Sequence, residues 1–216
     1  MHMKIAVLGT GTVGETLGTK LATLGHQVAM GSRTTDNRQA RAWAQTTGGR
    51  AGSFADAASG AKIVVNATAG TASLAALATL NPVDLDGTVL LDVANALDVS
   101  GGIPPVVAVQ GRDSLAEQIQ HAHSRARVVK TLNTMTAAVM VEPSLVPGRH
   151  VVFVSGDDAD AKATVTDLLM SFGWPADDVL DLGGLQTARG AEAYLTLWLA
   201  LWSAVGTPNF NVAVVR

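Results

Sequence analysis

The 216-residue sequence contains no cysteine, only 4% aromatic residues and only 15% charged residues. The lack of cysteine excludes disulfides, thiolate zinc sites and cysteine nucleophiles, and it fits a cytoplasmic protein. Redox chemistry in such a chain therefore needs a bound cofactor. The low charge, set against a hydrophobic content of 48%, excludes intrinsic disorder.

The sequence also lacks clusters of like charge. The net charge is -3 and no block of lysines and arginines occurs, so neither nucleic acid nor a membrane is expected as a partner. The uncharged stretch between Glu192 and Arg216 is interrupted by Gly206–Asn209, and its helical part, 193–205, is too short to cross a bilayer. The N-terminus lacks the apolar core of a signal peptide, so export is not expected.

Short apolar runs alternate with segments of helical periodicity along the chain. Strands are expected at Lys4–Leu8, Gln27–Met30, Arg50–Ala51, Lys62–Ala67, Thr88–Val93, Arg127–Lys130, His150–Val154 and Val179–Leu182. Helices are expected between Gly14 and Gly25 and at Arg38–Thr46, Phe54–Ala58, Ser114–His123, Ala137–Val141, from an Asp157 cap to Phe172, and Gln186–Val205. The sequence thus predicts an α/β fold with a doubly wound, mainly parallel sheet, which binds ligands at the carboxyl ends of its strands.

The glycines at 9, 11 and 14 form a G-x-G-x-x-G motif directly after the first strand and open the first helix. This context is typical of a dinucleotide site, in which the pyrophosphate meets the helix N-terminus. Gly9 permits the tight turn, Gly11 allows the backbone to approach the ligand, and Gly14 allows close packing of helix on strand. The intervening residues are expected to line the turn: Thr10, Thr12 and Val13. The alternative is a turn with no ligand.

The end of the second strand indicates which dinucleotide is bound. An NAD enzyme usually places a carboxylate there, whereas this chain has Ser32 and Arg33. A hydroxyl and a guanidinium can bind a 2′-phosphate, so the predicted cofactor is NADP(H). Arg38 is expected to add its charge to this site, or else to be an ordinary solvated helix residue.

No residue in the sequence is an obvious catalytic acid or base. The five histidines are expected to be solvated rather than catalytic, and His121 and His123 have a spacing unsuited to a metal pair. No metal site is therefore predicted. Lys130, near a strand end, is interpreted as part of a structural ion pair rather than as a base.

Several segments together resemble one family, the NADPH-dependent reductases of coenzyme F420, a deazaflavin. The resemblance is carried by Gly9–Gly14, Leu24–His26, Gly31–Arg33, Val129–Thr134, Gly156–Asp158, Asp181–Leu185 and Ala188–Arg189. It implies a Rossmann NADP-binding domain at 1–183 and a small C-terminal helical part at 184–216 that makes acceptor-site and dimer contacts. It also implies reversible hydride transfer between NADP(H) and coenzyme F420, in which the protein orients two stacked rings and no catalytic side chain is needed.

The resemblance implies further site residues. The NADP ribose and nicotinamide would be bordered by Thr68, Ala69, Ala94 and Asn95, and the stacked rings would rest on Asn133, Thr134 and Met135. These last three also follow a predicted strand, where such folds bind ligand. Asn133 is alternatively a helix cap.

Two other functions stay open for a chain with this cofactor site. One is an NADPH-dependent reductase of another small acceptor, such as a flavin, ferric iron or an imine, and the other is a non-catalytic NADP(H) sensor. The C-terminal helix is apolar on more than one face, with Trp198 and Trp202 among its residues. Such a helix must be covered nearly all round, which predicts a homodimer.

Overall fold

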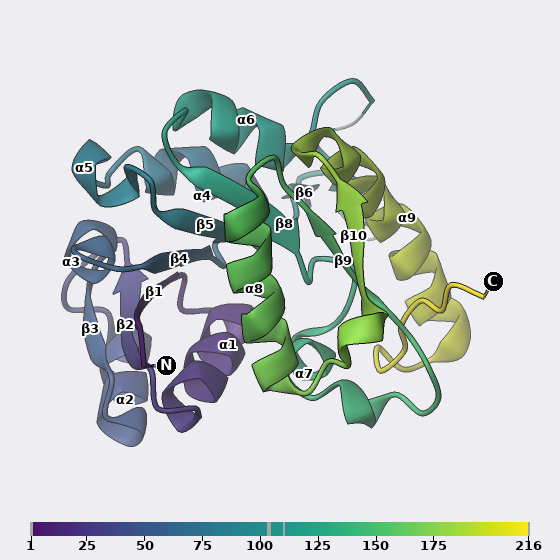
Figure 1. The fold of residues 1–216 in the computed structure, drawn as a ribbon, viewed down its shortest axis with the longest axis horizontal. Helices are drawn as coiled ribbons and strands as arrows, with labels where there is room; N and C mark the ends of the chain where they lie inside the picture. Colours follow the sequence, from purple (N-terminus) through teal and green to yellow (C-terminus); the bar gives the residue numbers. More distant parts are fainter. Residues whose placement is uncertain (1, 103–104, 110, 216) are drawn as a thin grey trace.

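An eight-stranded sheet forms the centre of the molecule in a computed structural model that describes residues 2–102, 105–109 and 111–215 (Figure 1). Its strands are β1 (Lys4–Leu8), β2 (Gln27–Ser32), β3 (Arg50–Ser53), β4 (Ile63–Asn66), β5 (Val89–Asp92), β8 (Arg127–Thr131), β9 (Val152–Ser155) and β10 (Val179–Gly183). Their order is β10-β9-β8-β5-β4-β1-β2-β3. Only the β8–β9 pair is antiparallel, which confirms the predicted mainly parallel, doubly wound α/β sheet.

Helices cover both faces of this sheet. The α-helices are α1 (Thr12–Thr23), α2 (Arg38–Thr47), α3 (Phe54–Ala58), α4 (Gly70–Leu77), α5 (Pro82–Leu85), α6 (Leu115–Ala122), α7 (Ala137–Val141), α8 (Ala159–Phe172) and α9 (Ala188–Val205). Short 3-10 turns occur at Pro143–Leu145, Ala176–Asp178 and Leu185–Thr187, and β6 (Leu97–Asp98) pairs with β7 (Val106–Val107) in a small antiparallel hairpin. Figure 1 shows α1 and α8 in front of the strands and α4 and α6 above them.

The alternation of side chains along each buried strand creates two cores. In β1, Ile5 and Val7 belong to the core beneath α1, α2, α7 and α8, whereas Ala6 and Leu8 belong to the core beneath α3 to α6. Successive side chains of a strand point to opposite faces, so a strand buried on both sides must be apolar at every position. This requirement explains why the strands stand out in the sequence as continuous apolar runs.

The structure adds elements that the sequence pattern did not reveal and corrects one cap. The short helices α4 and α5 and the hairpin β6–β7 were not expected. Asp157 was expected to cap α8, but Asp158 does so, because its side chain accepts a hydrogen bond from the amide of Ala161. Asp157 accepts one from the amide of Leu185 instead, at 2.8 Å, and so ties β9 to the turn that precedes α9.

The connections reverse direction between β1 and β4. From β1 the chain winds outward through β2 to β3, and then returns to β4, beside β1, and winds the other way through β5 to β8. Two loops therefore face each other across this point: the glycine-rich turn after β1 and the segment 67–69 after β4. A crevice at this place is where doubly wound sheets bind ligands.

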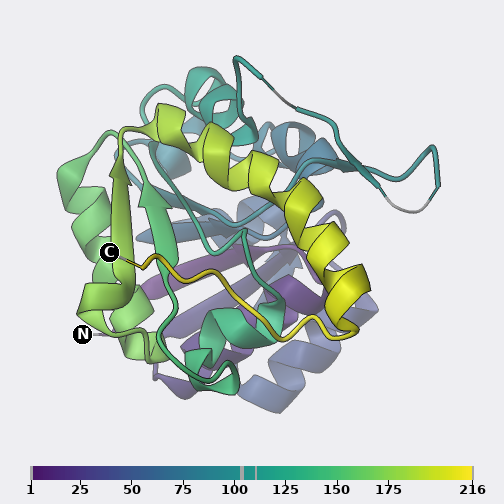
Figure 2. The same cartoon turned by 90° about the vertical axis from the view of Figure 1, so that its right-hand side faces the viewer.

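The C-terminal helix α9 lies across one side of the sheet domain and faces the viewer in Figure 2. It buries Leu195 and Trp198 against the body of the protein, yet Leu197, Trp202 and Val205 are exposed. The exposed apolar residues agree with the expectation of a helix with two apolar faces, and the homodimer stays a prediction. So does the division after Gly183, where β10 ends. Within the described residues, no helix is long and apolar enough to cross a membrane.

The close packing of α1 on the glycine turn gives a stability prediction. A Cβ added to Gly14 would lie 2.0 Å from the carbonyl oxygen of Gly9. We expect Gly14→Ala to lower the free energy of unfolding by about 1–3 kcal/mol or more, because backbone must move to make room. Gly190→Ala is the matched control, because Gly190 is also in a helix and a Cβ there meets nothing within 4 Å. This substitution should raise the free energy of unfolding by roughly 0.5–1 kcal/mol. Urea unfolding of both variants checks this, and equal stability of the two would contradict it.

Candidate functional site

The three glycines of the turn differ in what surrounds them. Gly9 has a φ of +119°, which favours glycine, and a Cβ there would lie 2.4 Å from the carbonyl oxygen of Ala67. Gly14 packs on Gly9 itself, as described above. Gly11 precedes the first residue of α1, and a Cβ there would meet nothing within 4 Å. The space beside Gly11 is therefore open, and the absence of a side chain there allows a ligand to approach the backbone.

The N-terminus of α1 suits an anion. Gly11 is the N-cap and no side chain caps the helix, so the first amides are not satisfied by a capping group. The helix dipole adds partial positive charge at the same place. Unpaired N–H groups and this partial charge together form the usual environment of a bound phosphate.

A cleft of about 720 Å³ opens beside this turn. Among the predicted cofactor residues, the structure brings seven together in its walls: Gly9, Thr10, Gly11, Ser32, Arg33, Thr68 and Ala69. Two others, Thr12 and Arg38, are exposed and do not line it, and Gly14 is buried behind the turn. Asn37 lines the cleft as well, which the sequence reasoning missed. Its capping of α2, by a hydrogen bond accepted from Ala40, is a signal that could have placed it there.

The two residues predicted to select the cofactor have different environments. Ser32 is buried, and its hydroxyl donates a hydrogen bond to the carbonyl oxygen of Thr34 at 2.5 Å, which shapes the turn after β2. Arg33 is exposed and has no ion pair with any residue that the structure describes. Its guanidinium therefore remains available for a phosphate at the end of the cleft.

A second cavity, of about 240 Å³, continues from the cleft, with Ala67 and Thr68 lining both. Besides Thr68, it contains five of the predicted site residues: Val13, Ala94, Asn95, Asn133 and Met135. The remaining walls are Val93, Leu97, Met140, Leu195 and Trp198. Leu195 and Trp198 belong to α9, and no local pattern in the sequence connects that helix with the glycine turn. None of the described residues that line this cavity has a titratable side chain.

Asn133 and Thr134 follow a strained residue at the end of β8. Leu132 is buried and has a φ of +63°, a left-handed conformation that a leucine seldom adopts. Asn133 is not a helix cap, since Thr136 precedes the first residue of α7 and Asn133 instead bonds to Asn95 and α9. Thr134 is buried outside the cavity lining, with a hydroxyl that has no hydrogen-bond partner in the described structure.

Lys130 forms the structural ion pair that the sequence led us to expect, in a fully buried cluster beside the second cavity. Its ammonium lies 2.8 Å from Asp92 and 3.0 Å from Glu192 of α9, and it donates a hydrogen bond to the carbonyl oxygen of Ala94 at 2.5 Å. Burial alone would lower the pKa of Lys130, but Asp92 and Glu192 more than offset this and raise it above its usual value. The lysine is held protonated, so it cannot act as a base.

The cluster extends toward both cavities. Glu192 accepts hydrogen bonds from the amides of Leu115 and Ala116 at the start of α6, so a helix N-terminus offsets part of its charge. On the other side, Asp92 accepts one from Asn66, whose side-chain oxygen accepts one from the hydroxyl of Thr68. The predicted cofactor residue Thr68 is thus joined to α9 through buried polar contacts.

The histidines do not contribute to this site. His150 was expected to be solvated, but it is buried, and its ring contacts the carbonyl oxygen of Pro143, the side chain of Asn211 and the edge of Trp174. It serves packing at the far end of β9. In the described part of the chain, no group of three histidine, aspartate or glutamate residues is arranged to hold a metal ion.

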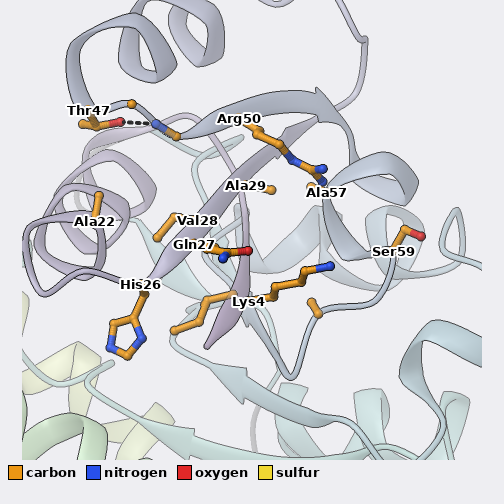
Figure 3. A pocket seen from close by; sticks show the side chains of 14 residues that line it. Lys4, Ala22, His26, Gln27, Val28, Ala29, Thr47, Arg50, Ala57 and Ser59 are labelled. Carbon is orange, nitrogen blue, oxygen red and sulfur yellow. Dashed lines mark hydrogen bonds between the residues drawn. The ribbon is translucent and has the colours of Figure 1, made fainter. Parts of the chain in front are cut away.

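A further cavity, of about 330 Å³, lies at the opposite edge of the sheet, where β1, β2 and β3 begin (Figure 3). Figure 3 shows the side chains of Lys4 and Arg50 extending toward Ser59 and Ala57, whereas Ala22 and Thr47, from the last turns of α1 and α2, lie on the other side of the cavity. The C-termini of helices carry partial negative charge, which disfavours a bound phosphate. This cavity therefore does not suit a dinucleotide, in contrast to the cleft beside the glycine turn.

Comparison with known proteins identifies a family and several related structures. The family model of the coenzyme F420-dependent NADP oxidoreductases matches residues 4–96, which include the glycine turn and every described wall of the large cleft. A candidate F420-dependent NADP reductase from Arthrobacter sp. FB24 has a crystal structure that matches with a TM-score of 0.93 and 50% identity, over 99% of this chain and 100% of that one.

Two more distant matches are a metalloreductase and a reductive aminase. Metalloreductase STEAP3 of Rattus norvegicus is 29% identical over 203 residues, which are 92% of this chain but only 38% of STEAP3. This chain thus spans well under half of that relative. A reductive aminase from Aspergillus terreus, solved with NADPH, has a TM-score of 0.66 at 19% identity, over 95% of this chain and 63% of the aminase. At that identity the likeness shows the fold alone.

The buried cluster predicts a large loss of stability for Lys130→Met. The substitution leaves Asp92 and Glu192 buried without their cation, so we expect the free energy of unfolding to fall by about 3–5 kcal/mol. Lys162→Met is the control, because the ion pair of Lys162 with Asp181 is partly exposed and should contribute only about 0–1 kcal/mol. Urea denaturation measures both. A loss at Lys130 no larger than that at Lys162 would show that the cluster adds little.

Proposed function

Since this chain belongs to the NADP oxidoreductase family whose model it matches, we propose that it transfers a hydride between NADP(H) and the deazaflavin coenzyme F420. In this proposal the dinucleotide lies in the large cleft, with its pyrophosphate on the glycine turn and α1. The nicotinamide ring enters the smaller cavity, where the acceptor ring stacks on it. NADP(H) supplies the hydride, and the protein binds and orients the two rings.

The observation that carries this proposal is the lining of the smaller cavity. Reduction of a ketone or aldehyde requires a proton at oxygen, usually from a nearby acid, and no described residue of this lining can supply one. Hydride transfer to a carbon of a conjugated ring spreads the charge over that ring and needs no such acid. The walls formed by Met135, Met140 and Trp198 are apolar and suit flat rings.

The exposed Arg33 supports NADP(H) as the dinucleotide. Its guanidinium is free at the end of the cleft farthest from the smaller cavity, where the adenosine ribose would lie, and no carboxylate lines the described walls of that cleft. A 2′-phosphate would therefore meet a positive charge and no negative one, whereas the ribose of NAD would lack the carboxylate that usually binds its two hydroxyls.

A second candidate function follows from the similarity to STEAP3, which covers 92% of this chain. That relative is named a metalloreductase. A hydride carries two electrons, whereas ferric iron takes one, so direct reduction of iron by NADPH is chemically mismatched. A flavin in the acceptor position, which receives the hydride and passes electrons on singly, would remove this mismatch.

The assay that tests the function compares acceptors. We expect purified protein to oxidise NADPH rapidly with coenzyme F420 and slowly or not at all with FMN or ferric citrate, measured by the loss of NADPH absorbance. Turnover with FMN but not with the deazaflavin would replace the first function by the second. Tight NADPH binding without turnover on any of the acceptors would indicate a nucleotide sensor.

The choice of dinucleotide is tested at Arg33. We expect Arg33→Ala to weaken NADPH binding by roughly ten- to a hundredfold, the loss of a charge-assisted hydrogen bond, and to leave NADH binding unchanged. Arg41→Ala is the control, because Arg41 is exposed on α2, the helix that follows the turn of Arg33, and does not line the cleft. Titration of both nucleotides by intrinsic fluorescence measures the effect. Equal losses for NADPH and NADH would refute the role of Arg33.

A further inference from the structure

Asn133 and Asn95 hold each other in fixed orientations at the smaller cavity. The side-chain nitrogen of Asn133 donates one hydrogen bond to the carbonyl oxygen of Ala191 in α9, at 2.9 Å, and one to the side-chain oxygen of Asn95, at 3.1 Å. The side-chain nitrogen of Asn95 donates a hydrogen bond in return to the backbone oxygen of Asn133, at 2.8 Å. Three parts of the chain that are distant in sequence therefore meet at these two side chains.

These contacts identify the nitrogen and the oxygen of each asparagine side chain. A backbone carbonyl can only accept a hydrogen bond, so the atom of Asn133 that faces Ala191 must be its nitrogen, and the atom of Asn95 that faces Asn133 must be its nitrogen too. Both hydrogens of the Asn133 nitrogen are then used. Its side-chain oxygen is the remaining polar atom of the amide, and its identity follows without further assumption.

The side-chain oxygen of Asn133 is left without a described partner. No described residue donates a hydrogen bond to this oxygen. It is also not one of the polar atoms that lack a partner and are completely shielded from solvent. Asn133 as a whole is only 2% exposed and lines the smaller cavity. This oxygen is thus a fixed hydrogen-bond acceptor in a site whose other walls are almost entirely apolar.

The position of this acceptor along the cleft identifies the group that it meets. The pyrophosphate site lies at Gly11 and the 2′-phosphate site at Arg33, so the other half of the dinucleotide extends past Thr68 into the smaller cavity. The ring at that end carries a carboxamide, whose NH2 group is a hydrogen-bond donor. A buried donor without a partner would be unfavourable in such apolar surroundings.

We propose that the side-chain oxygen of Asn133 accepts a hydrogen bond from the carboxamide NH2 of the nicotinamide ring, and so fixes the rotation of that ring. The proposal rests on the NADP(H) site proposed above. With the carboxamide anchored, the ring no longer rotates freely about its bond to the ribose, so it presents the same face to the acceptor each time. Asn133 is then the residue that sets the orientation of the hydride donor.

The surrounding structure prepares this contact before the nucleotide arrives. The left-handed turn at Leu132 directs the chain so that Asn133 points back to Asn95, and the bonds to Asn95 and Ala191 hold the side chain in place. A side chain held in this way loses little further freedom on binding, so the hydrogen bond contributes fully to affinity.

Nucleotide analogues test the proposal in the unaltered protein. The 3-acetylpyridine analogue of NADP+ keeps the carbonyl but replaces the NH2 by a methyl group, whereas the thionicotinamide analogue keeps the NH2 and replaces the oxygen by sulfur. By isothermal titration calorimetry we expect the acetylpyridine analogue to bind about fivefold more weakly than NADP+, the usual contribution of one hydrogen bond, and the thionicotinamide analogue to bind nearly as well as NADP+. Equal affinity of NADP+ and the acetylpyridine analogue would overturn the proposal.

Two variants separate the contact from the framework around it. In Asn133→Ala, NADP+ affinity should fall to that of the acetylpyridine analogue, so that the fivefold preference disappears. Asn95→Ala removes both hydrogen bonds between Asn95 and Asn133 but keeps the side-chain oxygen of Asn133 and its bond to Ala191. Any loss of affinity should therefore affect both nucleotides alike, and the preference should remain. A preference that persists in Asn133→Ala would also overturn the proposal.

The outcomes distinguish this inference from the function on which it rests. If the unaltered protein does not bind NADP+ at all, the proposed cofactor site is wrong. If it binds NADP+ but does not discriminate between the two analogues, the cofactor site stands and the contact with Asn133 is wrong.

Discussion

The ammonium group of Lys130 is the interaction on which the arrangement of both cavities depends. It is fully buried, and it joins Asp92 at the end of β5, the carbonyl oxygen of Ala94 and Glu192 of α9. A buried ion is costly unless its partners are close and complete, and here two carboxylates and a carbonyl surround it while the start of α6 supports Glu192. Because the cation sits between the sheet and the last helix, it determines how the wall formed by Leu195 and Trp198 lies relative to the loops after β4 and β5.

The cluster also explains why the smaller cavity is apolar although charged and polar groups lie so near it. The polar atoms of Asp92, Lys130 and Glu192 are directed at one another, and those of Asn66 and Thr68 continue the same network. The groups that could transfer protons are therefore used to hold the structure together. What faces a ligand is a set of apolar walls with a few amide groups, which is suited to orienting rings and unsuited to acid–base catalysis.

Much of this structure could be predicted from the sequence. The two-sided burial of the strands makes each of them a continuous apolar run, and the glycines at 9, 11 and 14 have meaning only together with the strand and helix that flank them. The rest depends on contacts between distant segments. That Asn133 bonds to Asn95 and Ala191 rather than capping α7 follows from the turn at Leu132, which no local pattern indicates. The choice between Asp157 and Asp158 as the cap of α8 was equally hidden, because both residues are good caps and only the packing of Leu185 decides between them.

The smaller cavity is built from three parts of the chain that are far apart in sequence. The segments after β1, β4 and β5 supply one part of the wall, the segment from Asn133 to Met140 a second, and α9 supplies Leu195 and Trp198. Substitutions in α9 can therefore reshape this wall of the cavity without altering the glycine turn. The family model covers residues 4–96, which include the loops after β1 and β4 and the first residues after β5 but not α9, so the matched segment supplies only part of the cavity wall.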